Sequence, residues 1–335
     1  MSEKILLDHG AGGRASHELV QRVFAERLAN PVLDAMDDAA VVEVPAGRLA
    51  ISTDTFVVDP IVFPGGNIGS LAVHGTVNDI CCRGAKPLWL TAGFVLEEGL
   101  EVSLLEEVVQ AMADAAAEAG VSIVAGDTKV VGRGQADKIF INTAGVGLIP
   151  AGVEIGGHMA RPGDAVLVSG TMGDHGVTIM AQRGGLGLNA PLKSDSASLH
   201  GMAAALIEAC SGLHVLRDPT RGGLATTLNE IAATSGVALE LNEDAIPVDP
   251  AVNGVCELLG LDPLYLANEG KLIAIMPEDQ AQAALKAMQA HAKGARAAVI
   301  GRVVEAPAGR VWLNTAVGGR RLLDMLSGEP LPRIC

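Results

Sequence analysis

The alternation of apolar and polar positions predicts helices and strands that follow one another through the first 150 residues. Apolar side chains at three- and four-residue spacing predict a helix that begins at Ser103 and ends at Gly120, with Glu106 completing a capping box. The same patterns predict further elements: helices at 19–28 and 71–80, and strands at 5–7, 37–42, 49–58, 88–94, 121–129 and 139–149.

The second half of the chain repeats this alternation, and the stretch from Pro150 to Pro162 separates the two halves. A chain of 335 residues is long enough for two domains with a core each. We therefore predict an N-terminal domain at 1–150, a C-terminal domain at 151–310 and a terminal segment at 311–335. The elements expected in the second half are strands at 165–169, 272–276 and 298–304, and helices at 202–209, 225–233 and 277–291.

Composition narrows the range of partners and compartments. The net charge is −15 without a basic cluster, which argues against nucleic acid and against an anionic membrane surface. No apolar run reaches the roughly 18 residues of a spanning helix, and the opening MSEKILLDHG lacks the form of a signal peptide. The five cysteines are scattered and have no zinc-type spacing. We expect a cytoplasmic protein with reduced thiols.

Two glycine-rich segments could bind an anion. Gly10, Gly12 and Gly13 lie in a turn before a helix, where free backbone N–H groups can meet a phosphate. This turn lacks the Gly-Lys-Ser/Thr ending of a Walker loop. The segment from Gly170 to Gly176 follows a strand and contains His175. A plain turn is the alternative explanation for both segments.

A set of aspartates is the main candidate for chemistry. Carboxylates without neighbouring Cys or His suit Mg²⁺, which bridges to nucleotide phosphates. Because the protein is acidic, Lys86, Lys129 or Arg221 would have to help the metal neutralise the phosphates. Each aspartate alone could equally be a turn residue. The set comprises Asp37, Asp38, Asp54, Asp79, Asp127 and Asp218.

The sequence ends in Pro332-Arg333-Ile334-Cys335, after a Gly/Pro-rich arm without helical or strand period. Proline stiffens such an arm, and a terminal residue is the most mobile position in a chain. A thiolate is a strong nucleophile. We therefore predict Cys335 to be a nucleophile on a movable arm, with an accidental cysteine in a frayed tail as the alternative.

Five motifs in order resemble the superfamily that includes aminoimidazole ribonucleotide synthetase and selenophosphate synthetase: DDAAVV, STDT, GTVNDICCRGAKP, AGDTKV and DPTRGGLA. Within that superfamily, HGAGGRASHEL near the start and PRIC at the end resemble the HypE family of hydrogenase maturation proteins. The resemblance covers nearly the whole chain. Adjacent Cys81 and Cys82 are the one feature that it does not assign.

The resemblance implies a fold and a set of site residues. The fold would be an α/β N-terminal domain, whose sheet pairs with that of a second subunit into a barrel, and an α+β C-terminal domain. ATP would lie in the cleft between them, near the homodimer interface. Mg²⁺ would be held by Asp37 or Asp38, Asp79 and Asp218. The other nucleotide-binding residues implied are Gly10, Gly12, Gly13, Asp54, Asn78, Lys86, Asp127 and Arg221.

The resemblance also implies a reaction. A partner carbamoyltransferase, HypF, would place a carbamoyl group on Cys335, and ATP would phosphorylate the carbamoyl oxygen. Loss of the amide protons and of phosphate would leave a thiocyanate, the cyanide donor to iron in [NiFe]-hydrogenase maturation through the HypC–HypD iron-carrier complex. Glu269 is the first candidate for the base, with His9 and His175 as alternatives. A solvated turn carboxylate and structural histidines are the competing explanations.

Two other functions remain open from the sequence. A selenophosphate-synthetase-like kinase would carry its reactive Cys in the N-terminal glycine-rich segment, and this chain has no Cys before Cys81. A non-catalytic scaffold would present Cys335 to the iron-carrier complex and use the nucleotide only as a switch.

Overall fold

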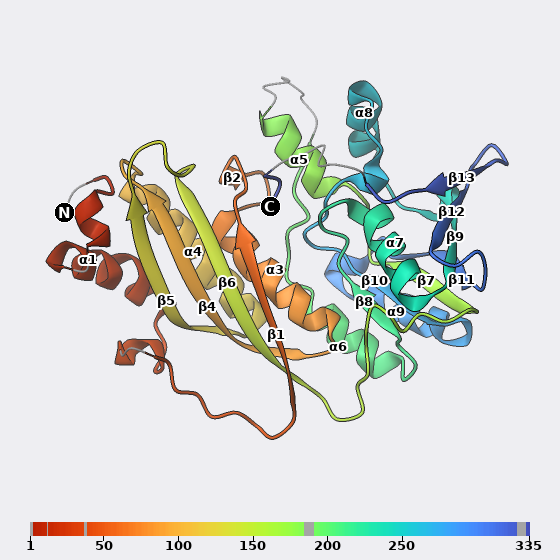
Figure 1. Cartoon of the computed structure of the whole chain (residues 1–335), viewed down its shortest axis with the longest axis horizontal. Helices are drawn as coiled ribbons and strands as arrows, with labels where there is room; N and C mark the ends of the chain where they lie inside the picture. Colours follow the sequence, from red (N-terminus) through yellow and green to blue (C-terminus); the bar gives the residue numbers. More distant parts are fainter. Residues whose placement is uncertain (1–2, 12, 37–38, 184–190, 327–332) are drawn as a thin grey trace.

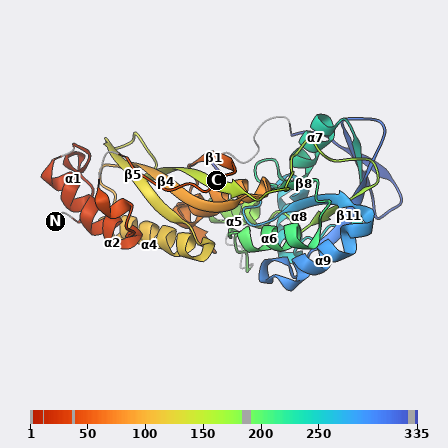
Figure 2. The same ribbon diagram turned by 90° about the horizontal axis from the view of Figure 1, so that it is seen from below.

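The computed structural model describes residues 3–11, 13–36, 39–183, 191–326 and 333–335. The molecule is elongated, with one sheet and its helices in each half (Figure 1). Seen from below, the N-terminal helices lie at one end and α9 (Ala281–Ala290) lies towards the other (Figure 2). None of the described helices combines the length and the apolar character that a membrane span requires.

The first half is built on a four-stranded sheet in the order β1-β6-β4-β5. Its strands are antiparallel except for β4 and β5, which α4 connects in parallel. Helices α3 and α4 lie behind the strands, and no described element covers the front face (Figure 1). The bounds are β1 (Arg48–Phe56), β4 (Lys86–Glu97), β5 (Ser122–Val131), β6 (Ile139–Ile149), α3 (Ile68–Cys82) and α4 (Val102–Ala119).

Short elements complete the first half. The hairpin of β2 (Val62–Phe63) and β3 (Gly66–Asn67) leads into α3, which Asn67 caps by accepting hydrogen bonds from the backbone N–H groups of Gly69 and Ser70. The residues described before β1 form short helical segments, of which η1 packs beside β5: η1 (Leu7–Gly10), α1 (Arg14–Leu19), η2 (Val20–Ala25), α2 (Glu26–Leu28) and η3 (Leu33–Ala35).

The second half contains a seven-stranded sheet in the order β13-β12-β9-β11-β7-β10-β8. Because β12 pairs with β9 and β13 pairs with β12, this sheet continues past residue 310 to Leu323, where we had expected a separate terminal segment. The strands are β7 (Asp164–Val168), β8 (Val215–Arg217), β9 (Ala238–Asn242), β10 (Ile273–Pro277), β11 (Ala298–Val304), β12 (Arg310–Asn314) and β13 (Arg320–Leu323). The helices are α5 (Asp174–Arg183), α6 (His200–Ala209), α7 (Gly223–Ser235), α8 (Pro250–Leu259) and α9, with 3₁₀ turns η4 (Glu243–Ala245), η5 (Pro263–Tyr265), η6 (Glu278–Gln280) and η7 (Ala292–Gly294).

One apolar core joins the two halves. It contains Leu71 and Val77 of α3 together with Met202 and Leu206 of α6, all fully buried. Helix α3 also contacts β8. Burial of apolar surface is the dominant stabilising contribution to such an interface, so α3 fixes the first sheet against the second half. A second core lies wholly within the second half.

The predicted element types are mostly confirmed, with three corrections in the first half. Residues 5–7, predicted as a strand, lead into the 3₁₀ turn η1. Of the strand predicted at 37–42, residues 37–38 lie outside the described residues and 39–42 form no strand; Val41 is 87% exposed. The capping box at Ser103 is wrong, because α4 begins at Val102 with no side-chain cap.

Candidate functional site

Three aspartates from three separate elements interact at the junction of the two halves. Asp54 lies on β1, Asp79 in the last turns of α3, and Asp218 directly after β8. The Ser52 hydroxyl donates to Asp79 Oδ2 at 2.6 Å. Asp79 interacts electrostatically with both Asp54 and Asp218. Packing of α3 against β1 and β8 therefore forms an acidic cluster, which we define as Asp54, Asp79 and Asp218.

The positive charge around the acidic cluster does not offset its burial. Burial, followed by the charge of Asp79, raises the pKa of Asp54 and raises that of Asp218 to about 7. Burial also raises the pKa of Asp79. Arg217 lowers the pKa of Asp79 and of Asp218, and Arg221 lowers that of Asp54 and of Asp79, but neither reverses the shift. Carboxyl groups held in this way favour a bound cation.

The cluster is not a preformed metal cage. Within the described ranges, no three His, Cys, Asp or Glu side chains come close enough together to hold an ion. Asp37 and Asp38, the other predicted metal ligands, lie outside the described residues. Their neighbours Met36 and Ala39 line a cavity that is described below.

Glu269 is buried close to this cluster, with only 3% of its surface exposed. Its Oε1 atom has no hydrogen-bond partner among the residues that the structure describes. Burial raises the pKa of Glu269 well above its ordinary value, and the charges of Asp195 and of the acidic cluster add to this effect. Burial thus favours the protonated form of this carboxyl group, and a cation bound nearby would oppose that shift.

The backbone around Glu269 is held by Asp195, which sequence reasoning missed. The Asp195 carboxylate accepts from the N–H of Glu269 at 3.2 and 3.3 Å and from the N–H of Gly270 at 3.1 Å. It also accepts from Lys271 Nζ at 3.0 Å, as does Asp174. Burial alone would raise the pKa of Asp195, but the charge and the hydrogen bond of Lys271 outweigh it and lower the pKa.

The last residues of the chain lie docked against the end of β1. The N–H of Val57 donates to the carbonyl of Cys335 at 3.1 Å, and the N–H of Asp59 donates to that of Arg333 at 3.3 Å. Ile334 is 3% exposed and belongs to the core that joins the two halves. Figure 1 shows this end of the chain between the halves, beside β2 and α5.

His175 contacts the docked tail directly. Its Nε2 lies 2.7 Å from the carbonyl oxygen of Ile334, and its Nδ1 lies 2.8 Å from Ser194 Oγ. The side chain is fully buried, and burial lowers its pKa, so the imidazole is neutral. Both ring nitrogens are hydrogen bonded, which leaves neither for proton transfer in this arrangement. We predicted His175 as an alternative base, but the structure places it as a tail contact.

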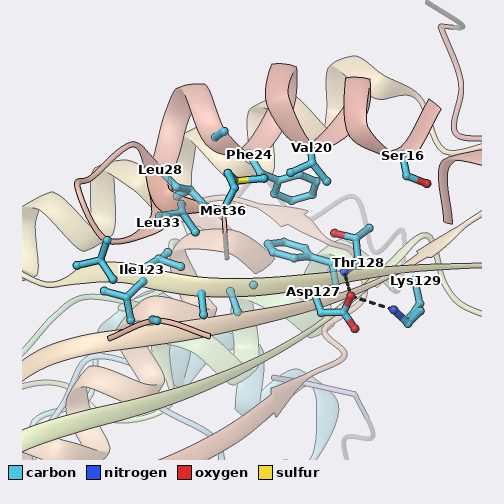
Figure 3. Close-up of a pocket in the computed structure, with 18 of the residues that line it drawn as sticks. Ser16, Val20, Phe24, Leu28, Leu33, Met36, Ile123, Asp127, Thr128 and Lys129 are labelled. Atoms are coloured by element: carbon cyan, nitrogen blue, oxygen red, sulfur yellow. Dashed lines mark hydrogen bonds and ion pairs between the residues drawn. The ribbon is translucent and has the colours of Figure 1, made fainter. Parts of the chain in front are cut away.

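A cavity of about 370 Å³ lies elsewhere in the first half, between the N-terminal helices and β5. Val20, Phe24 and Leu28 project into it from the helical side, whereas Asp127 and Lys129 lie at one end (Figure 3). His9 and Gly10 line the same cavity. A Cβ atom at Gly10 would approach the backbone nitrogen of Val130 to 2.7 Å, whereas one at Gly13 would meet open space. Gly12 lies outside the described residues.

Asp127 and His9 belong to this cavity and not to the acidic cluster. Asp127 of β5 pairs with Gly93 of β4, and Gly93 pairs with Asn142 of β6. Asn142 in turn pairs with Thr55 of β1. Asp54 is one position earlier on β1, so its side chain points to the opposite face of the sheet. The two aspartates are also three strands apart, roughly 14 Å. Within one chain they therefore cannot share a metal ion. His9, beside β5, is equally remote from the tail on β1.

Two other predicted nucleotide ligands have different places in the structure. Lys86 is exposed and pairs with Leu148 of β6, which in turn pairs with Leu49 of β1. Leu49 lies five residues before Asp54 on β1, so Lys86 is displaced by roughly 17 Å from Asp54 along the strand direction. Asn78 is buried, and its amide donates to the carbonyls of Ala197 at 3.0 Å and of Glu269 at 3.4 Å. Its oxygen accepts from the N–H of Leu199 at 2.8 Å.

The side chain of Asn78 thus joins α3 to the segment that carries Asp195 and to the Glu269 backbone, instead of pointing at a ligand. The cysteine pair next to it is buried as well. Cys82 Sγ lies 3.8 Å from Asp218 Oδ1, and burial raises the pKa of Cys82 well above its ordinary value. Its thiol is therefore a weak hydrogen-bond donor to the acidic cluster.

Comparison with family models identifies both halves. Residues 36–149 match the N-terminal domain of AIR synthase related proteins, and residues 161–314 match the C-terminal domain of the same group. A structure of thiamine-monophosphate kinase from Stenotrophomonas maltophilia, 22% identical with a TM-score of 0.67, shares the fold. The predicted two-part α/β and α+β fold class is confirmed.

Individual relatives are similar over nearly the whole chain. Carbamoyl dehydratase HypE of Azotobacter vinelandii is 54% identical over 98% of this chain and 96% of its own length. The Escherichia coli HypE is 49% identical over 99% of each chain. A crystal structure of HypE in complex with ATP has a TM-score of 0.96 and 55% identity, covering 98% of this chain and 99% of that one. A HypE–HypF complex has a TM-score of 0.81, with 47% identity over 91% of this chain and 99% of that one.

Proposed function

This chain belongs to the HypE family of carbamoyl dehydratases, and on that basis we propose that it converts a carbamoyl group on the Cys335 thiol into a thiocyanate at the expense of ATP. The docked tail supports the assignment most directly. Cys335 rests at the junction of the two halves. Adjacent residues bind both reacting segments, since Ser194 contacts the imidazole of His175 on the Ile334 carbonyl and Asp195 binds the backbone N–H of Glu269. The product would supply cyanide to iron during [NiFe]-hydrogenase maturation.

The chemistry proceeds in two balanced steps. The carbamoyl oxygen attacks the γ-phosphorus of ATP, ADP leaves, and the nitrogen loses one proton, which gives an O-phosphorylated thioimidate whose carbon carries the Cys335 sulfur, the phosphoryl oxygen and a C=N bond. Loss of phosphate from that carbon and of the second proton from nitrogen then forms the C≡N triple bond. Phosphorylation is required because an oxygen without it is a poor leaving group, and a base is required for each proton.

We assign the role of base to Glu269. It is the buried carboxyl group with an oxygen that has no partner in the described part of the chain, which suits a group that must receive a proton. Its raised pKa makes its basic form strongly proton-accepting once that form is generated. Asp195 and Asn78 fix the backbone on which this carboxyl group stands.

The residues present fit a magnesium ion. The acidic cluster consists of oxygen donors with too little positive charge around them, which is the donor set that Mg²⁺ prefers. We propose that Asp79 and Asp218 hold the ion together with Asp37 or Asp38 of a second copy of the chain, and that Asp54 lies beside it. When bound, Mg²⁺ would neutralise the phosphates and lower the pKa of neighbouring carboxyl groups. Arg221 would add positive charge at the same place.

ATP would use the cavity beside β5 as well as the acidic cluster. The apolar side of the cavity suits a base, and the backbone N–H groups around Gly10 and Gly13 suit phosphate. Because this cavity and the cluster lie on opposite edges of one sheet, we propose that a homodimer brings the cavity side of one subunit near the cluster of the other.

The uncovered face of the first sheet supports the homodimer. Ile51 on β1 is 74% exposed and Leu49 is 40% exposed. Ile51 pairs with Val146, which pairs with Trp89, so an apolar row crosses three strands on that face. A second copy of this face would bury the row and complete a barrel. The molar mass in solution tests this part of the proposal, since a monomer at working concentration would exclude it.

The proposal includes a carbamoyltransferase, an iron-carrier complex and a compartment. A HypF-type carbamoyltransferase would load Cys335, in keeping with the solved complex of a HypE relative with HypF. A HypC–HypD-type iron-carrier complex would accept the cyanide. The cytoplasm is the compartment proposed, because ATP and a reduced thiol must be present together.

Mass spectrometry of Cys335 tests the proposed reaction. After incubation with the transferase, carbamoyl donor and Mg-ATP, Cys335 should gain a carbamoyl group and then lose water while ATP is consumed. Cys335→Ser, which keeps the size of the side chain, should bind ATP normally and carry no modification. ATP hydrolysis without any change in the mass of the Cys335 peptide would favour the nucleotide-switched scaffold, and modification of the Cys335→Ser protein would overturn the assignment of the thiol.

A further inference from the structure

Ser194 and Asp195 are adjacent residues whose side chains serve two different parts of the proposed reaction. The Ser194 hydroxyl lies 2.8 Å from His175 Nδ1 and accepts from the N–H of Ser196 at 3.0 Å. Ser194 is 6% exposed, and the side chain of Asp195 is 4% exposed. The N–H of Ser194 donates to the carbonyl of Pro64 at 2.8 Å, so the pair is anchored to the first half of the molecule.

The hydrogen bonds fix the tautomer of His175. The carbonyl of Ile334 can only accept, so Nε2 of His175 must carry the proton. Nδ1 is then an acceptor, and the Ser194 hydroxyl donates to it. Because the backbone N–H of Ser196 donates to the same hydroxyl oxygen, the hydroxyl hydrogen is directed towards His175. Ser194 therefore determines which way the imidazole presents its proton to the tail.

Three consecutive tail carbonyls are bound by side chains or backbone of the core of the protein. The carbonyl of Arg333 accepts from the N–H of Asp59 and from the guanidinium of Arg183. The carbonyl of Ile334 accepts from His175, and the carbonyl of Cys335 accepts from the N–H of Val57. The contact made by His175 is the one at the peptide bond directly before Cys335. It therefore controls the position of the carbon that carries the thiol.

Asp195 performs the corresponding task for Glu269. Its two oxygens accept from the N–H groups of Glu269 and Gly270, and Lys271 keeps the carboxylate charged. The approach is close, since a Cβ atom at residue 270 would lie 1.9 Å from the Asp195 carbonyl oxygen. Glycine at this position is therefore required for the carboxylate of Asp195 to hold the turn.

We infer that the Ser194-Asp195 step is a positioning unit that sets the register between the thiol and the base: Ser194 orients His175 on the Ile334 carbonyl, and Asp195 holds the backbone of Glu269. This inference rests on the proposed roles of Cys335 and Glu269. Neighbouring residues in one short segment have side chains on different sides, so a single anchored stretch of backbone holds both reacting groups. Neither Ser194 nor Asp195 is a catalytic residue.

Two measurements separate the two arms of this unit. The first is the alkylation rate of Cys335 by iodoacetamide, followed on the Cys335 peptide, which reports how firmly the tail is docked. The second is single-turnover dehydration of protein carbamoylated with cyanate, which bypasses the partner transferase. Ser194→Ala should raise the alkylation rate roughly five- to tenfold, the effect of one lost buried hydrogen bond, and lower the dehydration rate. Asp195→Asn should lower dehydration by roughly tenfold or more and leave alkylation near the wild-type rate.

Ser196→Ala is the matched control. Ser196 lies in the same segment, is also buried, and its hydroxyl binds another buried imidazole, Nδ1 of His74, at 3.0 Å, without contact to the tail or to Glu269. It should leave both rates close to wild type. His175→Ala should reproduce the alkylation effect of Ser194→Ala, and His175→Gln, whose amide can donate to the Ile334 carbonyl, should restore part of the protection. This series covers the case in which Ser194→Ala fails to fold.

The inference is overturned if Ser194→Ala and His175→Ala alkylate at the rate of Ser196→Ala, or if Asp195→Asn dehydrates as fast as Ser196→Ala. A failure of the proposed function has a different appearance. Glu269→Gln protein that dehydrates the carbamoylated thiol at the wild-type rate would remove the base, and with it the role of Asp195, whatever the alkylation series shows.

Discussion

Two acidic regions of the molecule carry the same residue type in opposite electrostatic states. Beside the cavity, Asp127 is exposed, and Lys129 Nζ lies 2.9 Å from its Oδ1. This hydrogen bond lowers the pKa of Asp127. In the acidic cluster, burial and neighbouring carboxylates raise the pKa of Asp54 and of Asp218. Asp127 is therefore paired with a lysine, whereas none of the aspartates of the acidic cluster has a positive charge strong enough to offset its burial.

Aspartates in similar sequence motifs therefore have two different roles in this molecule. An aspartate with a neighbouring lysine on an exposed strand orients that lysine and costs little to keep charged. Buried aspartates that repel one another store unfavourable energy that a divalent cation can release. We therefore expect metal dependence to arise from Asp79 and Asp218 and not from Asp127, and substitutions in the two regions to differ in size and in kind.

The largest effect is expected at the metal ligands. Asp218→Asn, like Asp79→Asn, removes a charged oxygen donor and should lower Mg²⁺ affinity in the ATP-dependent reaction by more than the roughly 100-fold that outer-shell changes reach. Asp127→Asn is the matched control in the other region and should change the Mg²⁺ concentration for half-maximal rate by about twofold at most, since its ion pair is exposed. Equal losses in Asp218→Asn and Asp127→Asn would abolish the distinction between the regions.

A smaller effect is expected at the cavity, and it should concern the nucleotide and not the metal. Gly10→Ala would place a Cβ atom 2.7 Å from the backbone nitrogen of Val130, so the turn must move away from β5. We expect ATP binding, measured by calorimetry at saturating Mg²⁺, to weaken by roughly tenfold, about the loss of one or two hydrogen bonds.

Gly13→Ala provides the comparison for that measurement, because a Cβ atom there meets open space and the backbone φ of −90° suits any residue. Its effect on ATP affinity should be much smaller than that of Gly10→Ala. A loss at Gly13 alone would indicate that phosphate occupies that open space, and unchanged affinity in both variants would remove the turn from the nucleotide site.

The sequence predicted strand boundaries best where the strand's own residues are mostly apolar. The strands predicted at 139–149 and 298–304 agree with β6 and β11, because alternating or continuous apolar residues define their length. β12 was missed because only two of its five side chains are buried, so it has little apolar signal of its own. The valines at 41 and 42 have strand propensity, but a strand also needs a neighbour to bond with, and no described strand pairs with them.

The site was predictable as a list of residue types but not as an arrangement. Asp54, Asp79 and Asp218 were identified from their loops and motifs, and the structure brings them together. Asp127 and Lys86 carried the same signal and lie elsewhere in the chain's own sheet. The difference depends on which face of the sheet a residue occupies and how many strands separate it from the others, neither of which the motifs report.

Asp195 and Asn78 show the other limit. Asp195 stands between two serines in a polar segment that reads as a surface loop, yet its side chain is buried because α3 and the Glu269 turn close over it. The resemblance implied that Asn78 binds nucleotide, whereas its side chain bonds the segment around Ala197 and points to a different side of the helix from Asp79. Both cases concern contacts between residues more than 70 positions apart.

The smallest expected effect is on stability, and it distinguishes the two regions by the sign of their pH dependence. The pKa of Asp218 is about 7 in the folded protein against an ordinary value of 3.8, so the folded state binds more protons than the unfolded state across that interval. The free energy of unfolding of the metal-free protein should therefore fall as the pH rises from about 4 to about 7. Asp54, Asp79 and Glu269 have raised pKa values and contribute with the same sign.

Asp127 has a lowered pKa, so the stability it contributes is lost only as the pH falls below its ordinary value, outside this interval. Buried His74, whose pKa burial lowers to about 4, contributes with the opposite sign over part of this interval, as does His175. These histidines are common to the wild type and its variants, so we expect the Tm of the wild type minus that of Asp218→Asn, both in a chelator, to drop between about pH 5 and about pH 7, by roughly 2–4 °C for each kcal/mol lost. Mg²⁺ should reduce this drop, and the Tm of Asp127→Asn minus that of Asp218→Asn should show the same drop as the wild type. A Tm difference between wild type and Asp218→Asn that does not change with pH would show that the cluster is not short of positive charge, and the contrast between the two regions would then be lost.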